Sequence, residues 1–170
     1  MTIHSDHPFR NPQDDPVRRL RGRLGGTVTL LTAGEGVDRA GLTVTSLMVA
    51  AGEPPYVLAL VDPDSDLADA VEESGRAVLH LLSWRHRDLA EAFAGLAPAP
   101  GGLFSQAEFV VTEWGPRLVD APGWAALEVE AMRDVGWSRE LMLRLADVEV
   151  GEDDEPLFHR RGRYQRATDG

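Results

Sequence analysis

The sequence predicts a mainly β fold, a β-barrel with short helices, in one compact antiparallel domain. Short apolar runs of strand length recur along the chain, and glycine or proline separates one run from the next. Helical spacing of apolar residues is confined to a few short segments, which suits connections between strands. The length of 170 residues suits one domain with a sizeable core, and the sequence contains no internal repeat or domain linker.

The N-terminal part divides into an arm and the start of the domain. Residues 1–15 mix His, Pro, Asp and Asn without periodicity, so we expect a flexible N-terminal arm there and a single domain over residues 16–170. A short helix is expected to begin near Pro16 and to continue to Leu24. We interpret its arginines as a solvated helix face: Arg18, Arg19, Arg21 and Arg23.

The next third of the chain alternates strands with breaks. Strand-like patterns cover Thr27–Thr32 and Gly41–Ser46. Pro54-Pro55 cannot donate to a central ladder, so the sheet pauses there before the continuous apolar run Tyr56–Val61. Ser65 is a good N-cap for the helix that follows. That helix should end at a glycine C-cap, Gly75.

Strands dominate the remainder. A helix is expected over about His86–Ala94, because its apolar residues recur at helical spacing. The alternation of apolar and acidic residues from Leu127 to Ala131 suits a barrel wall that is wet on one side. Apolar runs predict strands at Arg76–Leu82, Glu108–Thr112, Trp124–Arg133, Arg139–Val150 and, last, Leu157–Tyr164.

Composition excludes several classes of function. The formal net charge of -11 argues against non-specific nucleic-acid binding, which needs a basic surface. The absence of cysteine excludes disulfides, thiolate catalysis and zinc–cysteine sites. The absence of lysine excludes Schiff-base chemistry. It also means that a phosphate must be held by arginine, hydroxyl or backbone N–H groups. With no signal-like start and no run of roughly 20 apolar residues, we expect a cytoplasmic protein that does not bind membranes.

The order of several short motifs resembles one family, the flavin reductase-like proteins. The first motif is Gly41-Leu42-Thr43-Val44-Thr45-Ser46, followed by Pro54-Pro55, an apolar strand and a polar turn into a helix. The likeness continues through Ser74-Gly75-Arg76, Phe93-Ala94-Gly95, Gly115-Pro116-Arg117-Leu118 and the segment from Pro156 to Tyr164. The resemblance implies an FMN-binding split barrel of antiparallel Greek-key type, covering the chain from about Leu20 to Tyr164.

The resemblance also implies a set of cofactor contacts. Hydroxyls on the strand around Thr45 could meet the polar edge or the phosphate of a flavin, although the same residues could be surface threonines of an edge strand. Arg85 could neutralise a flavin phosphate, or could lie on a solvated helix face. The cofactor-binding candidates are Thr43, Val44, Thr45, Ser46, Asp62, Ser65, Ser83, Arg85, His86, Phe93 and Trp137.

One departure concerns catalysis. Flavin reductases typically read Gly-Asp-His where this chain reads Gly136-Trp137-Ser138, and that histidine lines the nicotinamide side of the flavin. Ser138 is therefore the single catalytic candidate. Related sequences usually have asparagine at the position of His80, which we interpret as a hydrogen-bonded core histidine. The histidines show no metal-ligand spacing, so no metal site is predicted.

The resemblance implies an NAD(P)H-dependent flavin reductase that takes FMN or FAD and forms a homodimer. An oxygenase that receives the reduced flavin is the expected partner in such a system. Two alternatives stay open. One is a flavin-binding carrier or sensor without reductase activity, which Ser138 in place of the family's histidine favours, and the other is an oxidoreductase that uses a deazaflavin or haem on the same barrel.

Overall fold

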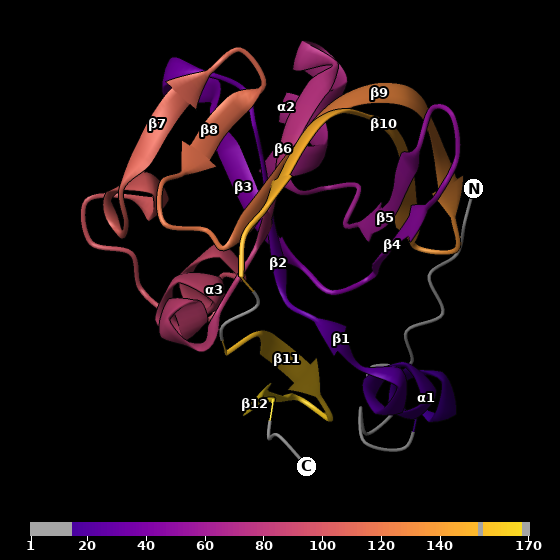
Figure 1. The fold of residues 1–170 in the computed structure, drawn as a ribbon. Coiled ribbons are helices and arrows are strands. Elements are labelled where there is room, and N and C mark those ends of the chain that lie inside the picture. Colours follow the sequence, from indigo (N-terminus) through magenta and orange to yellow (C-terminus); the bar gives the residue numbers. More distant parts are fainter. Residues whose placement is uncertain (1–14, 153–154, 168–170) are drawn as a thin grey trace.

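The computed structural model describes residues 15–152 and 155–167, and its main feature is a curled antiparallel sheet (Figure 1). The seven strands run in the order β3-β2-β6-β9-β10-β5-β4. They are β2 (Thr29–Ala33), β3 (Ala40–Val44), β4 (Leu47–Ala50), β5 (Tyr56–Val61), β6 (Arg76–Leu81), β9 (Gly123–Val135) and β10 (Ser138–Val150). The mainly β barrel with short helices that the sequence predicts is confirmed.

The two edge strands of this sheet are neighbours in sequence. β3 and β4 lie at opposite ends of the strand order, yet only Thr45 and Ser46 separate them along the chain. A two-residue link spans at most roughly 10 Å from one strand end to the next, so the sheet must curl until its edges approach each other. The backbone of Ser46 is also tied to the far edge, because the Leu60 N–H donates to its carbonyl at 2.8 Å. The chain therefore crosses the split of the barrel at Thr45-Ser46.

One apolar core fills the barrel. Helix α2 (Asp66–Ser74) buries Leu67 and Val71 in it, against inward-facing residues of the strands such as Leu127, Leu141 and Leu143. The Ser65 hydroxyl accepts from the Ala68 N–H, so Ser65 caps this helix as predicted, and Gly75 ends it in a left-handed conformation.

A second apolar core lies on the outer face of β2. Helix α3 (Arg87–Phe93) packs there, with β7 (Phe109–Thr112) and β8 (Gly115–Leu118) beside it (Figure 1). Phe93 meets the ring of Phe104 edge-on, with 5.3 Å between ring centroids. All five residues of β2 are buried because each face of that strand packs on one of the two cores.

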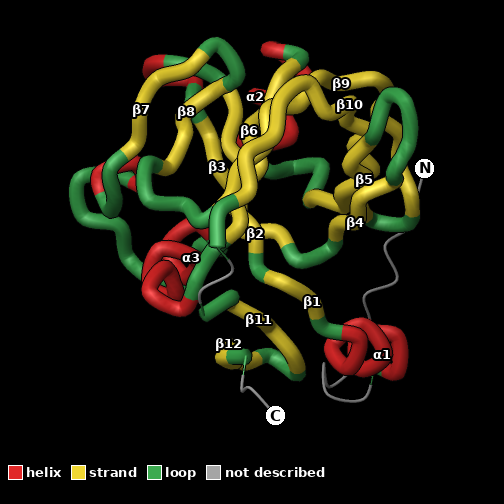
Figure 2. The backbone as a smooth tube through the Cα atoms, viewed as in Figure 1, coloured by secondary structure: helices red, strands yellow, loops and turns green. Residues whose placement is uncertain are grey.

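The C-terminal end folds back on the N-terminal helix α1 (Pro16–Leu24). β1 (Gly26–Thr27), β11 (Leu157–Arg160) and β12 (Arg163–Arg166) form a three-stranded sheet. Figure 2 shows α1 beyond the end of β1, apart from the other helices. The Arg161 N–H donates to the Gly22 carbonyl at 2.9 Å, so the turn between β11 and β12 holds α1 in place.

His80 joins three strands through its ring. The Leu118 N–H of β8 donates to Nε2 at 3.0 Å, which leaves Nδ1 protonated to donate to the Leu30 carbonyl of β2 at 2.9 Å. The residue is 0% exposed, and burial lowers its pKa to about 4, with Arg117 and His86 adding to the shift. The interpretation of His80 as a hydrogen-bonded core histidine is confirmed.

Two details of the predicted elements were wrong, and the strand β8 was not predicted. The segment Leu157–Tyr164 is a hairpin and not one strand, because Arg161 and Gly162 form a two-residue turn with φ of 55° and 74°. The alternation from Leu127 to Ala131 is interrupted, because the pairing with β10 skips Glu130 and turns Ala131 outward. The sequence also gave no signal for β8, whose Gly-Pro start is unusual in a strand.

The predicted arm of residues 1–15 lies almost wholly outside the described residues; Asp15, at its end, accepts from the Val17 N–H and caps α1. Among the helices described, none is both long and apolar enough to cross a membrane.

Candidate functional site

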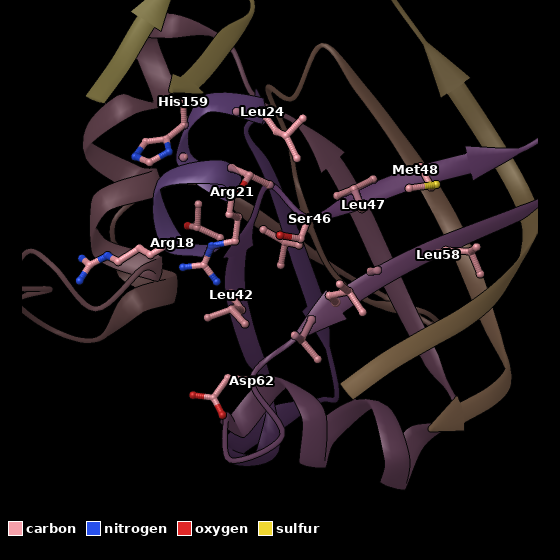
Figure 3. Close-up of a pocket in the computed structure, with 18 of the residues that line it drawn as sticks. Arg18, Arg21, Leu24, Leu42, Ser46, Leu47, Met48, Leu58, Asp62 and His159 are labelled. Atoms are coloured by element: carbon pink, nitrogen blue, oxygen red, sulfur yellow. The ribbon is translucent and has the colours of Figure 1, made fainter. Parts of the chain in front are cut away.

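A large cleft opens beside the split of the barrel (Figure 3). Its volume is about 1390 Å³, which exceeds the range of about 300–1,000 Å³ typical of small-molecule pockets. The strand end from Thr43 to Ser46 forms its base, β5 and the tip of the β9–β10 hairpin form one wall, and α1 with the β11–β12 turn forms the other.

Four of the predicted contacts line the base of the cleft. Ser46 is exposed and Thr45 half-buried, so both hydroxyls are within reach of a ligand. Thr43 is already engaged, because its hydroxyl donates to the Ala90 carbonyl of α3 at 2.7 Å. The Val44 side chain is buried in the barrel core, so only its backbone can face the cleft.

The wall from β5 and the β9–β10 hairpin is apolar. Leu58 and Leu60 point away from the barrel core, and each pairs with an outward residue of β10. Val135 lines the cleft, and its cross-strand partner is Ser138, so Ser138 lies on the same face of the hairpin. Met48 on β4 extends this apolar surface. Such a surface suits a flat aromatic ring.

Trp137 occupies the tip of the β9–β10 hairpin. It is 67% exposed and follows Gly136, which has φ of 58°, in the two-residue turn between Val135 and Ser138. Trp137 itself does not line the cleft, whose nearest lining residues on this hairpin are Val135 and Glu140, two and three positions away.

The wall formed by α1 is basic. Four arginines of the helix and Arg161 of the β11–β12 turn line the cleft, together with His159 of β11. Figure 3 shows the Arg21 side chain extending from α1 toward Leu42, while Arg18, three residues earlier on the same helix, extends to the left of the view. The prediction of a solvated arginine face is confirmed in that these side chains are exposed, but the sequence did not indicate that they line a cleft.

Asp62 and Ser65 lie at the turn after β5. Asp62 lines the cleft, and its Oδ1 accepts from the Asp64 N–H at 2.9 Å. The Ser65 hydroxyl donates to the Asp62 carbonyl and accepts from Ala68, so its hydrogen-bonding capacity is used in the cap.

Three further candidates lie together elsewhere, at the start of the 3-10 turn before α3. The Ser83 N–H donates to His86 Nδ1 at 3.1 Å, and His86 Nε2 donates to Asp120 Oδ1 at 3.0 Å. Arg85 pairs with the same carboxylate at 3.3 Å and donates to the Asp120 carbonyl. Neither this cluster nor Phe93, which is buried in the outer core, lines the cleft.

The order Ser83–His86–Asp120 has the partners of a hydrolytic triad but not its accessibility. Ser83 is 2% exposed, and its backbone already donates to the imidazole nitrogen that would act as the base. Burial lowers the pKa of His86. Burial opposes the ionisation of Asp120, but the hydrogen bond from His86 and the charge of Arg85 outweigh it and lower the pKa of that carboxyl. The buried His86 imidazole is therefore neutral. Its hydrogen bonds to Ser83 and Asp120 cap and anchor the start of α3.

Within the residues described, no cluster of His, Asp and Glu could hold a metal ion. The cleft instead combines exposed hydroxyls, an apolar wall and a basic wall. These are the surfaces that a phosphorylated aromatic ligand requires.

The motif pattern of the flavin reductase like domain matches residues 21–168, nearly all of the described chain. The chain belongs to the flavin reductase like family. An NADH:FMN oxidoreductase of Rhodococcus qingshengii is 30% identical over 83% of this chain and 75% of its own length. The reductase component of 4-hydroxyphenylacetate 3-monooxygenase from Pseudomonas aeruginosa is 24% identical over 92% of this chain and 97% of its own length.

Solved structures agree on the fold. The NADH:FAD oxidoreductase of Streptomyces globisporus C-1027 superposes with a TM-score of 0.82 at 21% identity, covering 95% of this chain and 97% of that one. The styrene monooxygenase flavin reductase of Pseudomonas putida S12 gives a TM-score of 0.79 at 21% identity, over 91% of this chain and 98% of that one. The split barrel implied by the motifs is therefore the fold of this flavin reductase like domain.

Proposed function

We propose that this protein is an NAD(P)H-dependent flavin reductase that supplies reduced FMN or FAD. The observation that carries the proposal is the cleft at the barrel split, where exposed hydroxyls of the family motif face an apolar wall and a basic wall. Membership of the flavin reductase like family supports the same activity. Relatives named as reductase components of monooxygenases support an oxygenase as the recipient of the reduced flavin.

The residues of the cleft fit a flavin. Leu58, Leu60 and Val135 offer an apolar surface of the kind that excludes water from an aromatic ring system. Thr45 and Ser46 would donate to the polar edge of that ring or to the phosphate. Asp62 lines the same cleft, and an N–H group of the ligand would donate to the carboxylate oxygen of Asp62 that does not accept from the Asp64 N–H.

When bound, the flavin would supply the ring that accepts a hydride from the reduced nicotinamide. The chain's own task is to bind and orient the two ring systems and to exclude water. Hydride transfer needs no acid or base from the protein, which agrees with a cleft whose ionisable groups are mainly arginines. Ser138 would contribute one hydrogen bond, but it cannot carry a charge near neutral pH as the family's histidine can.

The first experiment measures flavin binding and turnover. Titration with FMN, followed by quenching of flavin fluorescence, should saturate, and Thr45→Ala with Ser46→Ala should weaken binding by roughly 1–3 kcal/mol. NADH or NADPH oxidation should exceed the free-flavin background. If FMN binding saturates but NADH and NADPH are not oxidised, the protein is a flavin carrier, the alternative that Ser138 favours, and not a reductase. If the purified protein has the absorption spectrum of a deazaflavin or a haem, its cofactor is that group and not FMN.

We also propose a homodimer that assembles through apolar surface near the site. On the edge strand β4, Met48 is exposed on the face that it shares with Leu58, and Val49 is exposed on the opposite face; Trp137 is exposed at the tip of the β9–β10 hairpin. Trp114 and Trp124 are half-buried, and each carries an arginine side chain stacked on its ring within the monomer, so we do not include them in the proposed surface. An isologous contact of edge strand and hairpin tip would cover apolar side chains that a monomer leaves in water.

A further inference from the structure

We propose that the arginine face of α1 is a phosphate-binding wall, in which Arg18 and Arg21 hold a phosphate group of a nucleotide in the cleft. This proposal rests on the function proposed above and assigns a task to a helix that lies before the first motif of the family. The phosphate belongs either to the flavin or to the nicotinamide nucleotide, and the two sources are separated by experiment below.

The first observation is a local excess of positive charge in an acidic protein. The chain carries a formal net charge of -11, yet among the described residues the cleft is lined by five arginines and two carboxylates. The arginines are Arg18, Arg19, Arg21, Arg23 and Arg161, and the carboxylates are Asp62 and Glu140. A concave basic surface on an anionic protein attracts an anionic ligand and orients its approach.

The second observation is that the two carboxylates do not neutralise these arginines. Glu140 is paired with Arg133, with 2.8 Å between Nε and Oε1, and Asp62 accepts from the backbone of its own turn. Over residues 15–152 and 155–167, no carboxylate lies within ion-pair distance of Arg18 or Arg21. Within that part of the chain, both guanidinium groups therefore keep their donors for a ligand.

The third observation is that the helix is held in position. Its N-terminus is capped by Asp15, and its C-terminal half is tied to the β11–β12 hairpin. There the Gly22 carbonyl accepts from the Arg161 N–H, and the Arg23 carbonyl accepts from Arg160 Nε at 3.1 Å. The same turn brings Arg161 to the cleft, so the backbone segments that carry the basic groups are held by contacts between α1 and the hairpin. A helix that is already docked does not have to be ordered when the ligand binds, which lowers the entropic cost of binding.

The chemistry fits phosphate better than carboxylate or ring recognition. With no lysine in the chain, arginine is the only side chain that can offer a permanent positive charge. Its planar guanidinium group matches the oxygens of a phosphate. Arg85, the arginine that the sequence suggested for this task, is occupied by Asp120 and does not line the cleft. The α1 arginines are the groups available there.

The test compares ligands that differ by a phosphate. The double variant Arg18→Gln with Arg21→Gln, and a matched control Arg163→Gln at an exposed position outside the cleft, are titrated with FMN and with riboflavin. We expect the double variant to lose about tenfold or more in affinity for FMN, with riboflavin unchanged. The control should leave both affinities unchanged. Added salt should weaken FMN binding by the wild type and barely affect the double variant.

Calorimetric titration of the riboflavin-bound protein with NAD⁺ tests whether the bound phosphate instead belongs to the nicotinamide nucleotide. Weaker NAD⁺ binding by the double variant, with an unchanged ratio of FMN to riboflavin affinity, would place the nicotinamide nucleotide's phosphates on α1. If the double variant binds FMN, riboflavin and NAD⁺ as the wild type does, the proposal is overturned. Because these are binding measurements, they hold whether or not the protein oxidises NADH, so failure of the reductase function is recognised separately by the turnover assay.

Discussion

The ring of His80 makes stability depend on pH, and the magnitude follows from its surroundings. Both ring nitrogens are hydrogen-bonded, and Nε2 must stay unprotonated to accept from Leu118. The pKa is about 4 in the folded protein against an ordinary value of 6.5. Between those pH values the unfolded chain binds a proton that the folded protein excludes, so the free energy of unfolding falls as the pH falls. The loss begins near pH 6.5, is complete near pH 4 and amounts to roughly 3 kcal/mol.

The assay is urea denaturation at several pH values between 7.5 and 4 for the wild type, His80→Asn and His159→Asn. Asparagine is uncharged over this range and can replace one of the two hydrogen bonds, so His80→Asn should cost roughly 1–3 kcal/mol at pH 7.5. That difference should shrink as the pH falls, because the free energy of unfolding falls through His80 in the wild type and not in the variant, which lacks this imidazole. His159→Asn alters a half-buried histidine of β11 and leaves His80 and both of its hydrogen bonds in place, so its curve should run parallel to that of the wild type. Parallel curves for the wild type and His80→Asn would refute the reasoning.

Three other predictions concern the site. Ser138→His should raise NADH oxidation with FMN in a steady-state assay, because it restores an imidazole on the face that carries Val135; equal rates would place Ser138 away from the nicotinamide. Gly26→Ala should destabilise the fold by roughly 1–3 kcal/mol in thermal or urea unfolding and weaken FMN binding, since its Cβ would lie 2.9 Å from the Thr45 carbonyl; unchanged stability and affinity would contradict this. Light scattering on a sizing column should give a dimer at micromolar protein, and Met48→Glu should shift it towards monomer, whereas a monomeric wild type would contradict the proposed interface.

The parts of the fold that the sequence predicted well are those set by neighbouring residues. The strand Tyr56–Val61 was predicted with its observed bounds, because a continuous apolar run follows a proline pair. The helix between Ser65 and Gly75 was recognised by its two caps. The hairpin after Leu157 was missed because its turn places an arginine, Arg161, at φ of 55°, where asparagine or glycine is usual.

The parts of the candidate site that could not be predicted depend on distant contacts. The hydroxyl strand was identified from a contiguous motif, and it does line the cleft. The basic wall depends on a contact between Arg160 and the Arg23 carbonyl, 137 residues apart in sequence, which no local pattern reveals. Arg85 was predicted as a phosphate ligand, but in the structure it is paired with Asp120. Asp120 lies 35 residues further along the chain, so the sequence around Arg85 does not reveal this pairing.

The docking of the β11–β12 hairpin on α1 also orders events during synthesis. α1 precedes every strand of the barrel in the chain, but a nine-residue helix is marginal in water without tertiary contacts. The hairpin that holds it, Leu157–Arg166, is synthesised after all of those strands. A nascent chain that stops before Leu157 already carries the seven strands of the barrel and all four arginines of α1, yet it lacks the hairpin contacts that hold that helix beside the cleft. The basic wall of the cleft is thus completed later in synthesis than the barrel itself.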